Sequence, residues 1–150
     1  MSQAALKKPS ALSLKDPSLF RQQCYINGQW ADADSGKTID VTNPATGEVL
    51  GTIPNMGTAE TRRAIEAANA AWAGWRKKTA KERANILRKL FNLMMENQED
   101  LAILMTAEQG KPMAESKGEI AYAASFIEWF AEEGKHTYGD VIPAHQPDKR

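Results

Sequence analysis

Apolar residues recur at helical spacing through much of the second half of the chain. A 3.6-residue stripe runs through Ile86, Leu87, Leu90, Leu93 and Met94. Thr79 precedes this stripe, and Glu82 follows three residues later, which is the spacing of a capping box. The pattern predicts a helix that begins at Thr79. An alanine-rich segment from Thr58 onward predicts a helix before it.

Two further helices are expected downstream. Asn97 is placed to cap a third helix, which the breaker Gly110-Lys111-Pro112 ends. Pro112 suits the start of a fourth helix, expected to run to about Gly134. Its aromatic residues widen the apolar surface beyond one stripe; they are Tyr122, Phe126, Trp129 and Phe130. Such a helix requires more than one neighbour.

The first half of the chain shows short strand patterns around turn residues. Asn27-Gly28 lies between two apolar runs and predicts a hairpin with strands at about 23–26 and 29–31, because a type I′ turn needs positive φ at both central residues. A second turn, 43–47, separates β-branched residues around Val41 from a strand-like segment at 49–53.

The balance of elements indicates an incomplete α/β fold. Four helices accompany only short, edge-like strands, and no buried run of Val and Ile supplies the central sheet that such helices cover. Residues 1–18 mix Ser, Ala, Lys and Pro without periodicity and are expected to form a flexible N-terminal arm. The fold is expected to occupy residues 19–150 as one unit.

Charge and composition narrow the classes of partner. The 19 basic and 19 acidic residues cancel, so no long-range field favours nucleic acid or an anionic membrane. No stretch approaches the roughly 20 apolar residues that span a bilayer, and the first residues lack the apolar core of a secretory signal. A cytoplasmic location is expected. One cysteine excludes an internal disulfide.

The sequence offers few candidates for catalysis. It has no glycine-rich phosphate-binding motif, so no residue is assigned to a nucleotide. Cys24 begins a strand and is expected to be a half-buried structural residue. His136 and His145 lack a third ligand at metal-site spacing. The adjacent carboxylates at 99–100 and 132–133 are expected on solvated helix faces. We therefore expect no catalytic residue in this chain.

Three segments carry a resemblance to a known family. They are FRQQCYINGQW, VTNPATGEVLGTIPNMG and the run from AKERANILRKLF to the end of the chain. Together they closely resemble the start of bacterial NAD(P)-dependent succinate-semialdehyde dehydrogenases and of relatives acting on glutarate semialdehyde. The NPATGE turn and the EQGKP breaker are typical of aldehyde dehydrogenases in general, whereas GEIAYAASFIEWFAEEG is typical of the semialdehyde branch.

The resemblance implies the fold and reaction of that family. A cysteine attacks the aldehyde, hydride passes to NAD or NADP, and a glutamate activates the water that releases the acid. The family's nucleophile, general base and cofactor-binding lysine all match positions beyond Arg150. The chain would then be the N-terminal part of the cofactor-binding domain, ending before the oligomerisation hairpin, the main dinucleotide-binding sheet and the catalytic domain. By itself it is expected to be inactive.

Lesser roles are carried over from the family residue by residue. A monovalent cation is implied at the carbonyls of Val41 and Thr42 and the carboxylate of Glu108, where many relatives have Asp. The structural alternative is an N-terminal turn braced by a surface carboxylate. The resemblance also places Tyr122 and Phe126 on the wall of the substrate tunnel, while core packing is the alternative for Phe126.

The resemblance also implies partners. A small aldehyde is the expected substrate, and the full-length protein is expected to be a homo-oligomer, namely a tetramer. One alternative is another aldehyde dehydrogenase branch, such as one acting on betaine aldehyde. A second is a non-catalytic shortened chain that binds full-length subunits; a stop codon after Arg150 in the native gene would favour it.

Overall fold

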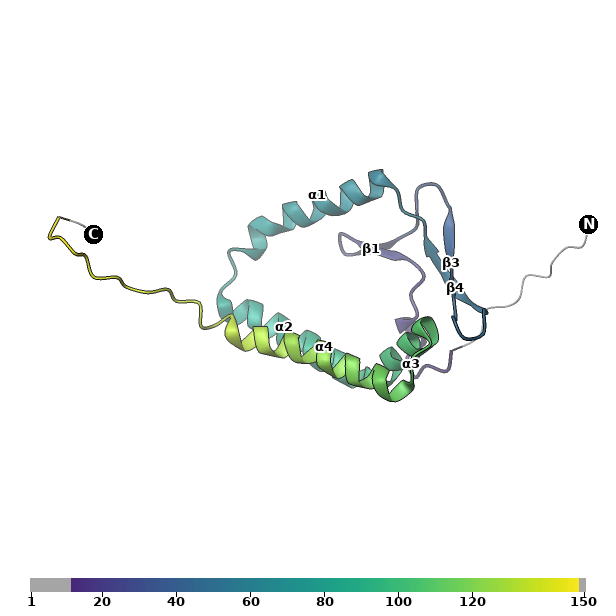
Figure 1. Ribbon diagram of the computed structural model, residues 1–150. Helices are drawn as coiled ribbons and strands as arrows, with labels where there is room; N and C mark the ends of the chain where they lie inside the picture. Colours follow the sequence, from purple (N-terminus) through teal and green to yellow (C-terminus); the bar gives the residue numbers. More distant parts are fainter. Residues whose placement is uncertain (1–11, 149–150) are drawn as a thin grey trace, which may run out of the picture.

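The computed structural model describes residues 12–148 and has the mixed α/β fold expected from the sequence (Figure 1). The elements are a 3₁₀ turn η1 (Pro17–Leu19), strands β1 (Cys24–Ile26), β2 (Gln29–Ala31), β3 (Thr38–Thr42) and β4 (Val49–Pro54), and helices α1 (Thr58–Trp75), α2 (Ala80–Glu96), α3 (Gln98–Gln109) and α4 (Met113–Glu133). The expected helices and hairpins are confirmed to within a few residues.

The strands form two separate antiparallel hairpins within residues 12–148. In β1–β2, Asn27 and Gly28 have φ of 51° and 79°, the two positive values that a type I′ turn requires. In β3–β4, the side chain of Asn43 accepts a hydrogen bond from the Ala45 N–H at 2.9 Å, and Gly47 closes the turn with φ of 72°.

Helices α2 and α4 pack against each other in opposite directions. Arg88 of α2 bonds to Glu128 and Glu132 late in α4, whereas Gln98, just beyond α2, bonds to the Lys117 carbonyl early in α4. Three small residues of these helices are buried, namely Ala84 of α2 and Ala124 and Ala131 of α4. The helices therefore approach closely, as small side chains permit.

The apolar stripe predicted on α2 is divided between two faces. Leu87 and Met94 are half-buried, whereas Ile86, Leu90 and Leu93 remain nearly half exposed. A 3.6-residue stripe this wide covers more of the helix circumference than one neighbouring helix can bury. Ile86, Leu90 and Leu93 are consequently only partly covered by the described residues.

The corner between α3 and α4 also contacts the β3–β4 turn. The hydroxyls of Thr106 and Ser116 join the two helices at 2.8 Å. Gly110 ends α3 with a left-handed φ of 72°, and a Cβ at this position would lie 2.9 Å from Cγ of Pro44. Glycine at this position thus adopts the left-handed conformation that ends the helix, and its lack of a side chain lets the NPATGE turn come close.

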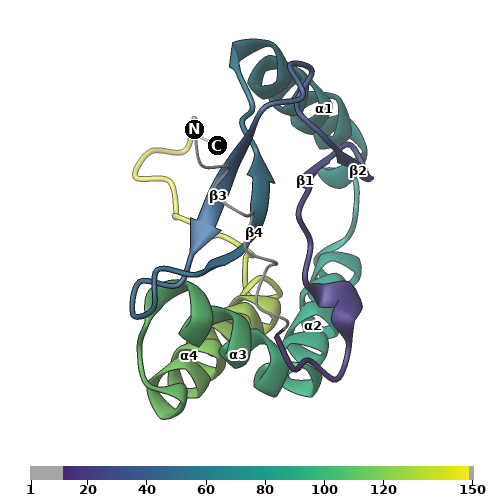
Figure 2. The same ribbon diagram turned by 90° about the vertical axis from the view of Figure 1, so that its right-hand side faces the viewer.

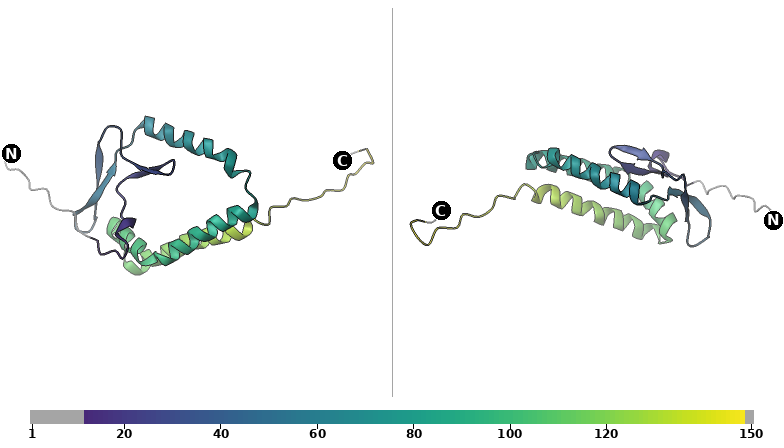
Figure 3. Two further views of the ribbon diagram at one scale, coloured as in Figure 1. Left: turned by 180° about the vertical axis from the view of Figure 1, so that it is seen from behind. Right: turned by 90° about the horizontal axis from the view of Figure 1, so that it is seen from above.

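Helix α1 lies apart from the other helices and contacts chiefly the β1 hairpin (Figures 2 and 3). The loop after β2 holds its first turn. Glu60 is buried, and its carboxylate accepts hydrogen bonds from the N–H groups of Asp34 at 2.9 Å and Gly57 at 3.0 Å. Arg63 adds a bidentate ion pair with Asp34 at 2.7 and 2.8 Å.

The chain ends differ in how they are held. The flexible arm was expected over residues 1–18, and residues 1–11 of it lie outside the described residues. In the described part, the N–H groups of Lys15 and Asp16 donate hydrogen bonds to the Asp100 carboxylate. Residues 134–148 form no helix or strand and extend away from the helices (Figure 1).

Replacement of Glu60 by Gln should lower the stability of the fold at neutral pH. Hydrogen bonds from its own N–H and then from Asp34 lower the pKa of Glu60 below the ordinary 4.5. A lowered carboxyl pKa stabilises the fold above the unfolded-state pKa, and this contribution is lost as pH falls through the folded-state value. Gln supplies one acceptor where the carboxylate supplies two.

Urea unfolding followed by circular dichroism at about pH 7 and about pH 3 tests this expectation. The difference between wild type and Glu60→Gln should be large at the higher pH and small at the lower. Glu66→Gln, a change on the exposed part of α1, is the matched control and should have little effect at either pH. Equal destabilisation by Glu60→Gln at both values would contradict the assigned role.

Candidate functional site

One side of α4 presents a cluster of aromatic side chains, which we name the aromatic face: Tyr122, Phe126, Trp129 and Phe130. Their side chains are between 46% and 66% exposed. The opposite side of α4 is buried through Ser116, Ile120 and Ala124. Because these buried residues fix the rotation of α4, the aromatic face points away from the buried side of the helix.

The residues predicted to line a substrate tunnel both belong to the aromatic face. The rings of Tyr122 and Phe126 lie 4.9 Å apart between centroids and nearly perpendicular, at 80°. Phe126 lines an open groove of about 670 Å³ together with Trp129 and Phe130. Tyr122 is not among the residues lining this groove. The structure thus groups the two residues on one exposed surface.

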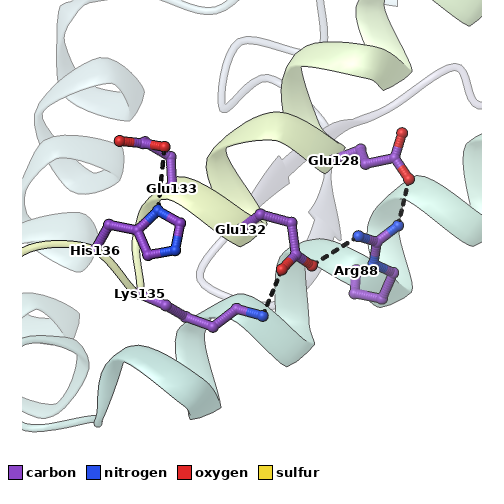
Figure 4. A network of polar contacts seen from close by, with 6 residues as sticks. All are labelled: Arg88, Glu128, Glu132, Glu133, Lys135 and His136. Carbon is purple, nitrogen blue, oxygen red and sulfur yellow. Dashed lines mark hydrogen bonds and ion pairs between the residues drawn. The ribbon is translucent and has the colours of Figure 1, made fainter.

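Ion pairs form the polar border of the groove (Figure 4). Arg88 donates to Glu128 at 2.6 Å and to Glu132 at 2.8 Å, and these bonds raise its pKa. Glu132 also accepts from Lys135 at 2.6 Å, and this contact and then Arg88 lower the pKa of its carboxyl. The charges of the border are therefore paired with one another.

The groove provides a binding surface without reactive groups. Its one hydroxyl, on Ser125, donates to the Tyr122 carbonyl at 2.7 Å, so it is engaged within its own helix. Arg88 faces two carboxylates, and the remaining surface is aromatic. Nucleophilic catalysis needs a side chain activated by an adjacent base, and the lining residues supply none.

Two of the three predicted cation ligands lie near one another. Val41 and Glu108 line a cavity of about 30 Å³, which also receives Arg21 and Gln22. Thr42 is not among its lining residues. The cavity is about as large as one water molecule. The guanidinium of Arg21 lies over the ring of Trp30, 5.0 Å from its centroid, and Trp30 is not among the residues lining the cavity.

The cysteine and histidines are not gathered into a centre. Cys24 is half-buried at the start of β1, paired with Ala31 across the hairpin. His136 contacts Glu133 at 3.4 Å, and His145 is exposed in the segment after α4. Within residues 12–148, no three His, Cys, Asp or Glu side chains are placed to hold a metal ion. No helix in this range is long and apolar enough to cross a membrane.

The expectation that adjacent carboxylates are solvated was wrong for Asp100. Its side chain is only 2% exposed, and its two oxygens accept the N–H groups of Lys15 at 3.0 Å and Asp16 at 2.8 Å. Glu99 beside it follows the expectation more closely and pairs with Lys117 at the surface. The partners of Asp100 are backbone groups more than 80 residues away. Helical periodicity gives no signal for such a contact.

The comparisons with known proteins agree with the motifs. The chain is 73% identical to the glutarate-semialdehyde dehydrogenase of Pseudomonas putida and 68% identical to an NADP⁺ succinate-semialdehyde dehydrogenase of Escherichia coli, each over 139 residues. Both matches cover 93% of this chain and 29% of the relative. The chain therefore spans less than a third of the length of these relatives.

Solved structures show the same fold. An NADP dependent enzyme of E. coli superposes with a TM-score of 0.88 at 69% identity, covering 90% of this chain and 28% of the other. The succinate-semialdehyde dehydrogenase of Burkholderia pseudomallei gives 0.87 at 67% identity, covering 89% and 28%. The model of the aldehyde dehydrogenase family matches residues 30–150. With these matches and the shared fold, the chain belongs to the aldehyde dehydrogenase family.

Proposed function

We propose that this chain is the N-terminal part of an NAD(P)-dependent dehydrogenase that oxidises succinate or glutarate semialdehyde to the dicarboxylate. The observation that carries the proposal is the 68–73% identity to relatives named for these two substrates, maintained over 139 residues. The betaine aldehyde dehydrogenase of Staphylococcus aureus, at 30% identity, represents another branch and is much less similar.

In the proposed enzyme, the aromatic face of α4 forms one wall of the substrate tunnel. This face is aromatic, and the charges at its border are paired with one another. The buried side of α4 fixes the orientation of the helix and so of the aromatic face. Such a surface holds the aliphatic portion of a short semialdehyde and excludes water from it. Tyr122 and Phe126 are the residues assigned to this role.

The nicotinamide cofactor accepts hydride in the family reaction. The sequence lacks a glycine-rich motif of the kind that holds nucleotide phosphates. We assign no residue of the chain to the cofactor and no catalytic residue to the chain. The full-length protein is proposed to be a cytoplasmic homotetramer.

We further propose a monovalent cation at the carbonyls of Val41 and Thr42 and the carboxylate of Glu108. The proposal is supported by the small cavity that Val41 and Glu108 both line. It is also supported by the close approach of Gly110 to Pro44, which brings the EQGKP breaker next to the NPATGE turn. Hard oxygen ligands suit such an ion.

The 150-residue chain alone should produce no reduced cofactor from succinate or glutarate semialdehyde with either NAD⁺ or NADP⁺. The reason is that its described residues provide no activated nucleophile beside the groove. Absorbance of reduced cofactor measures the outcome. A rate above buffer background that disappears in Cys24→Ser would contradict the expectation.

The same preparation tests the alternative of a non-catalytic chain that binds full-length subunits, which the exposed aromatic face favours. Refolding the P. putida enzyme with an excess of the chain should leave recovered activity unchanged under the leading proposal. A dose-dependent loss would favour the alternative.

Substitution of the aromatic face should impair catalysis in a chimera in which this chain replaces the matching segment of the P. putida enzyme. Tyr122→Ala or Phe126→Ala should reduce kcat/KM for the semialdehydes by about tenfold or more, because each removes an apolar contact from the tunnel wall. Trp72→Ala, an exposed aromatic on α1, is the matched control. Equal kcat/KM in all three variants would refute the assignment.

The cation proposal predicts that potassium or sodium raises the Tm of this chain relative to choline at equal ionic strength. Glu108→Gln should abolish the difference, since it removes the charged ligand, and binding to the native state alone is what raises Tm. Glu48→Gln in the exposed β3–β4 turn should preserve it. An ion-independent wild-type Tm would contradict the site.

A further inference from the structure

The N–H of Thr52 is a backbone donor on the outer edge of β4, the edge that does not face β3. In the β3–β4 ladder, Thr38 lies opposite Pro54 and Asp40 lies opposite Thr52. Because backbone groups alternate in direction along a strand, Pro54 and Thr52 have the same orientation. The neighbouring N–H of Asn55 bonds to the Lys37 carbonyl, so the N–H of Thr52 points away from β3.

A side chain from the N-terminal segment occupies this donor. The Oε1 atom of Gln22 accepts the Thr52 N–H at 2.8 Å. A Cβ on Gly51 would lie 2.7 Å from the same oxygen and 2.8 Å from the ring of Phe20, so glycine is required for the approach. Pro54 has no N–H to offer. On the outer edge of β4, the N–H of Thr52 is thus already hydrogen-bonded, and Pro54 has no N–H that could pair with another strand.

The other end of the same segment is held by α3. Asp100 is buried in the first turn of α3 and receives the N–H groups of Lys15 and Asp16. Between the two attachments, the turn η1 is closed by the Asp16 carboxylate, which accepts the Ser18 N–H at 2.9 Å. The connection from Asp16 to Gln22 is therefore short and locally structured.

We propose that residues 15–22 form a strap that covers the outer edge of β4, and that Asp100 holds the strap closed. The strap joins α3 to the β3–β4 hairpin by backbone donors at one end and a side-chain acceptor at the other. Its release at Asp100 frees the Thr52 N–H from Gln22, so the two attachments open together.

The test is Asp100→Asn in the full 150-residue chain. The amide keeps the shape of the carboxylate but offers one acceptor oxygen in place of two, so at least one strap hydrogen bond is lost. Trypsin cleavage after Lys15 and after Arg21 should accelerate on the order of ten- to a hundredfold, which is the effect of losing a hydrogen bond to a charged group. Amide exchange at Thr52 should accelerate with it.

The matched control is Glu99→Gln, which removes a negative charge from the adjacent position of α3. Glu99 pairs with Lys117 at the surface and does not touch the strap, so cleavage and exchange should match wild type. Wild-type cleavage rates in Asp100→Asn would overturn the proposal. Faster cleavage after Lys15 with unchanged exchange at Thr52 would also overturn it, because the two attachments would then be independent.

A second variant keeps the proposal testable if Asp100→Asn loses helix content by circular dichroism. Gln22 is exposed, and Gln22→Met retains length while removing the acceptor. Exchange at Thr52 and cleavage after Arg21 should both accelerate, again with Glu99→Gln as the control. Unchanged exchange at Thr52 in Gln22→Met would overturn the strap.

Discussion

The packing of α2 against α4 determines how the helices of the second half of the chain are arranged. Ala84 of α2 and Ala124 and Ala131 of α4 are buried, and small side chains let packed helix backbones approach each other. With α4 held by this side, its aromatic residues must lie on the other. The position of α3 follows as well, because Thr106 and Ser116 join it to the first turns of α4. The exposure of the candidate site is thus a consequence of the packing of the helices.

The features that sequence reasoning predicted are those set by neighbouring residues. Asn27-Gly28 needs positive φ at both positions, Thr79 and Glu82 close the start of α2, and Gly110 ends α3, whatever the rest of the chain does. Each is a local conformational constraint, and each was found in place. The grouping of Tyr122 and Phe126 follows equally from a spacing of four residues on one helix.

The features that it missed depend on contacts between distant segments. Asp100 resembled Glu99 in sequence, and only the arrival of the N-terminal segment buries one and not the other. The stripe on α2 was recognised, yet its division into a packed half and an exposed half depends on the number of neighbours it finds. The proximity of Val41 to Glu108 came from family resemblance alone, since the 66 positions between them carry no physical signal of it.

The amount of buried apolar surface also bears on function. Leu50 is the largest side chain that is fully buried among residues 12–148, and the rest of the core is mostly alanine. Large apolar side chains on α1, α2 and α4 are exposed at the same time. A core this small stabilises a chain of this length weakly, because apolar burial is the main favourable term in folding. Small burial and exposed helix faces are what the proposal of an N-terminal part predicts, because the relatives that match this chain are more than three times as long.

The pairing of charges around the groove limits what this part of the proposed enzyme does for its substrate. Succinate and glutarate semialdehyde each carry a carboxylate at the end opposite the aldehyde. Arg88 is the one basic residue that lines the groove, and Glu128 and Glu132 already accept its hydrogen bonds. A substrate carboxylate would have to displace Glu128, which would then be unpaired, or Glu132, which would keep only Lys135. Either exchange places the freed glutamate next to a second negative charge, which is unfavourable. The aromatic face therefore contributes shape and exclusion of water to the proposed tunnel, and recognition of the substrate's charge has to come from outside this surface.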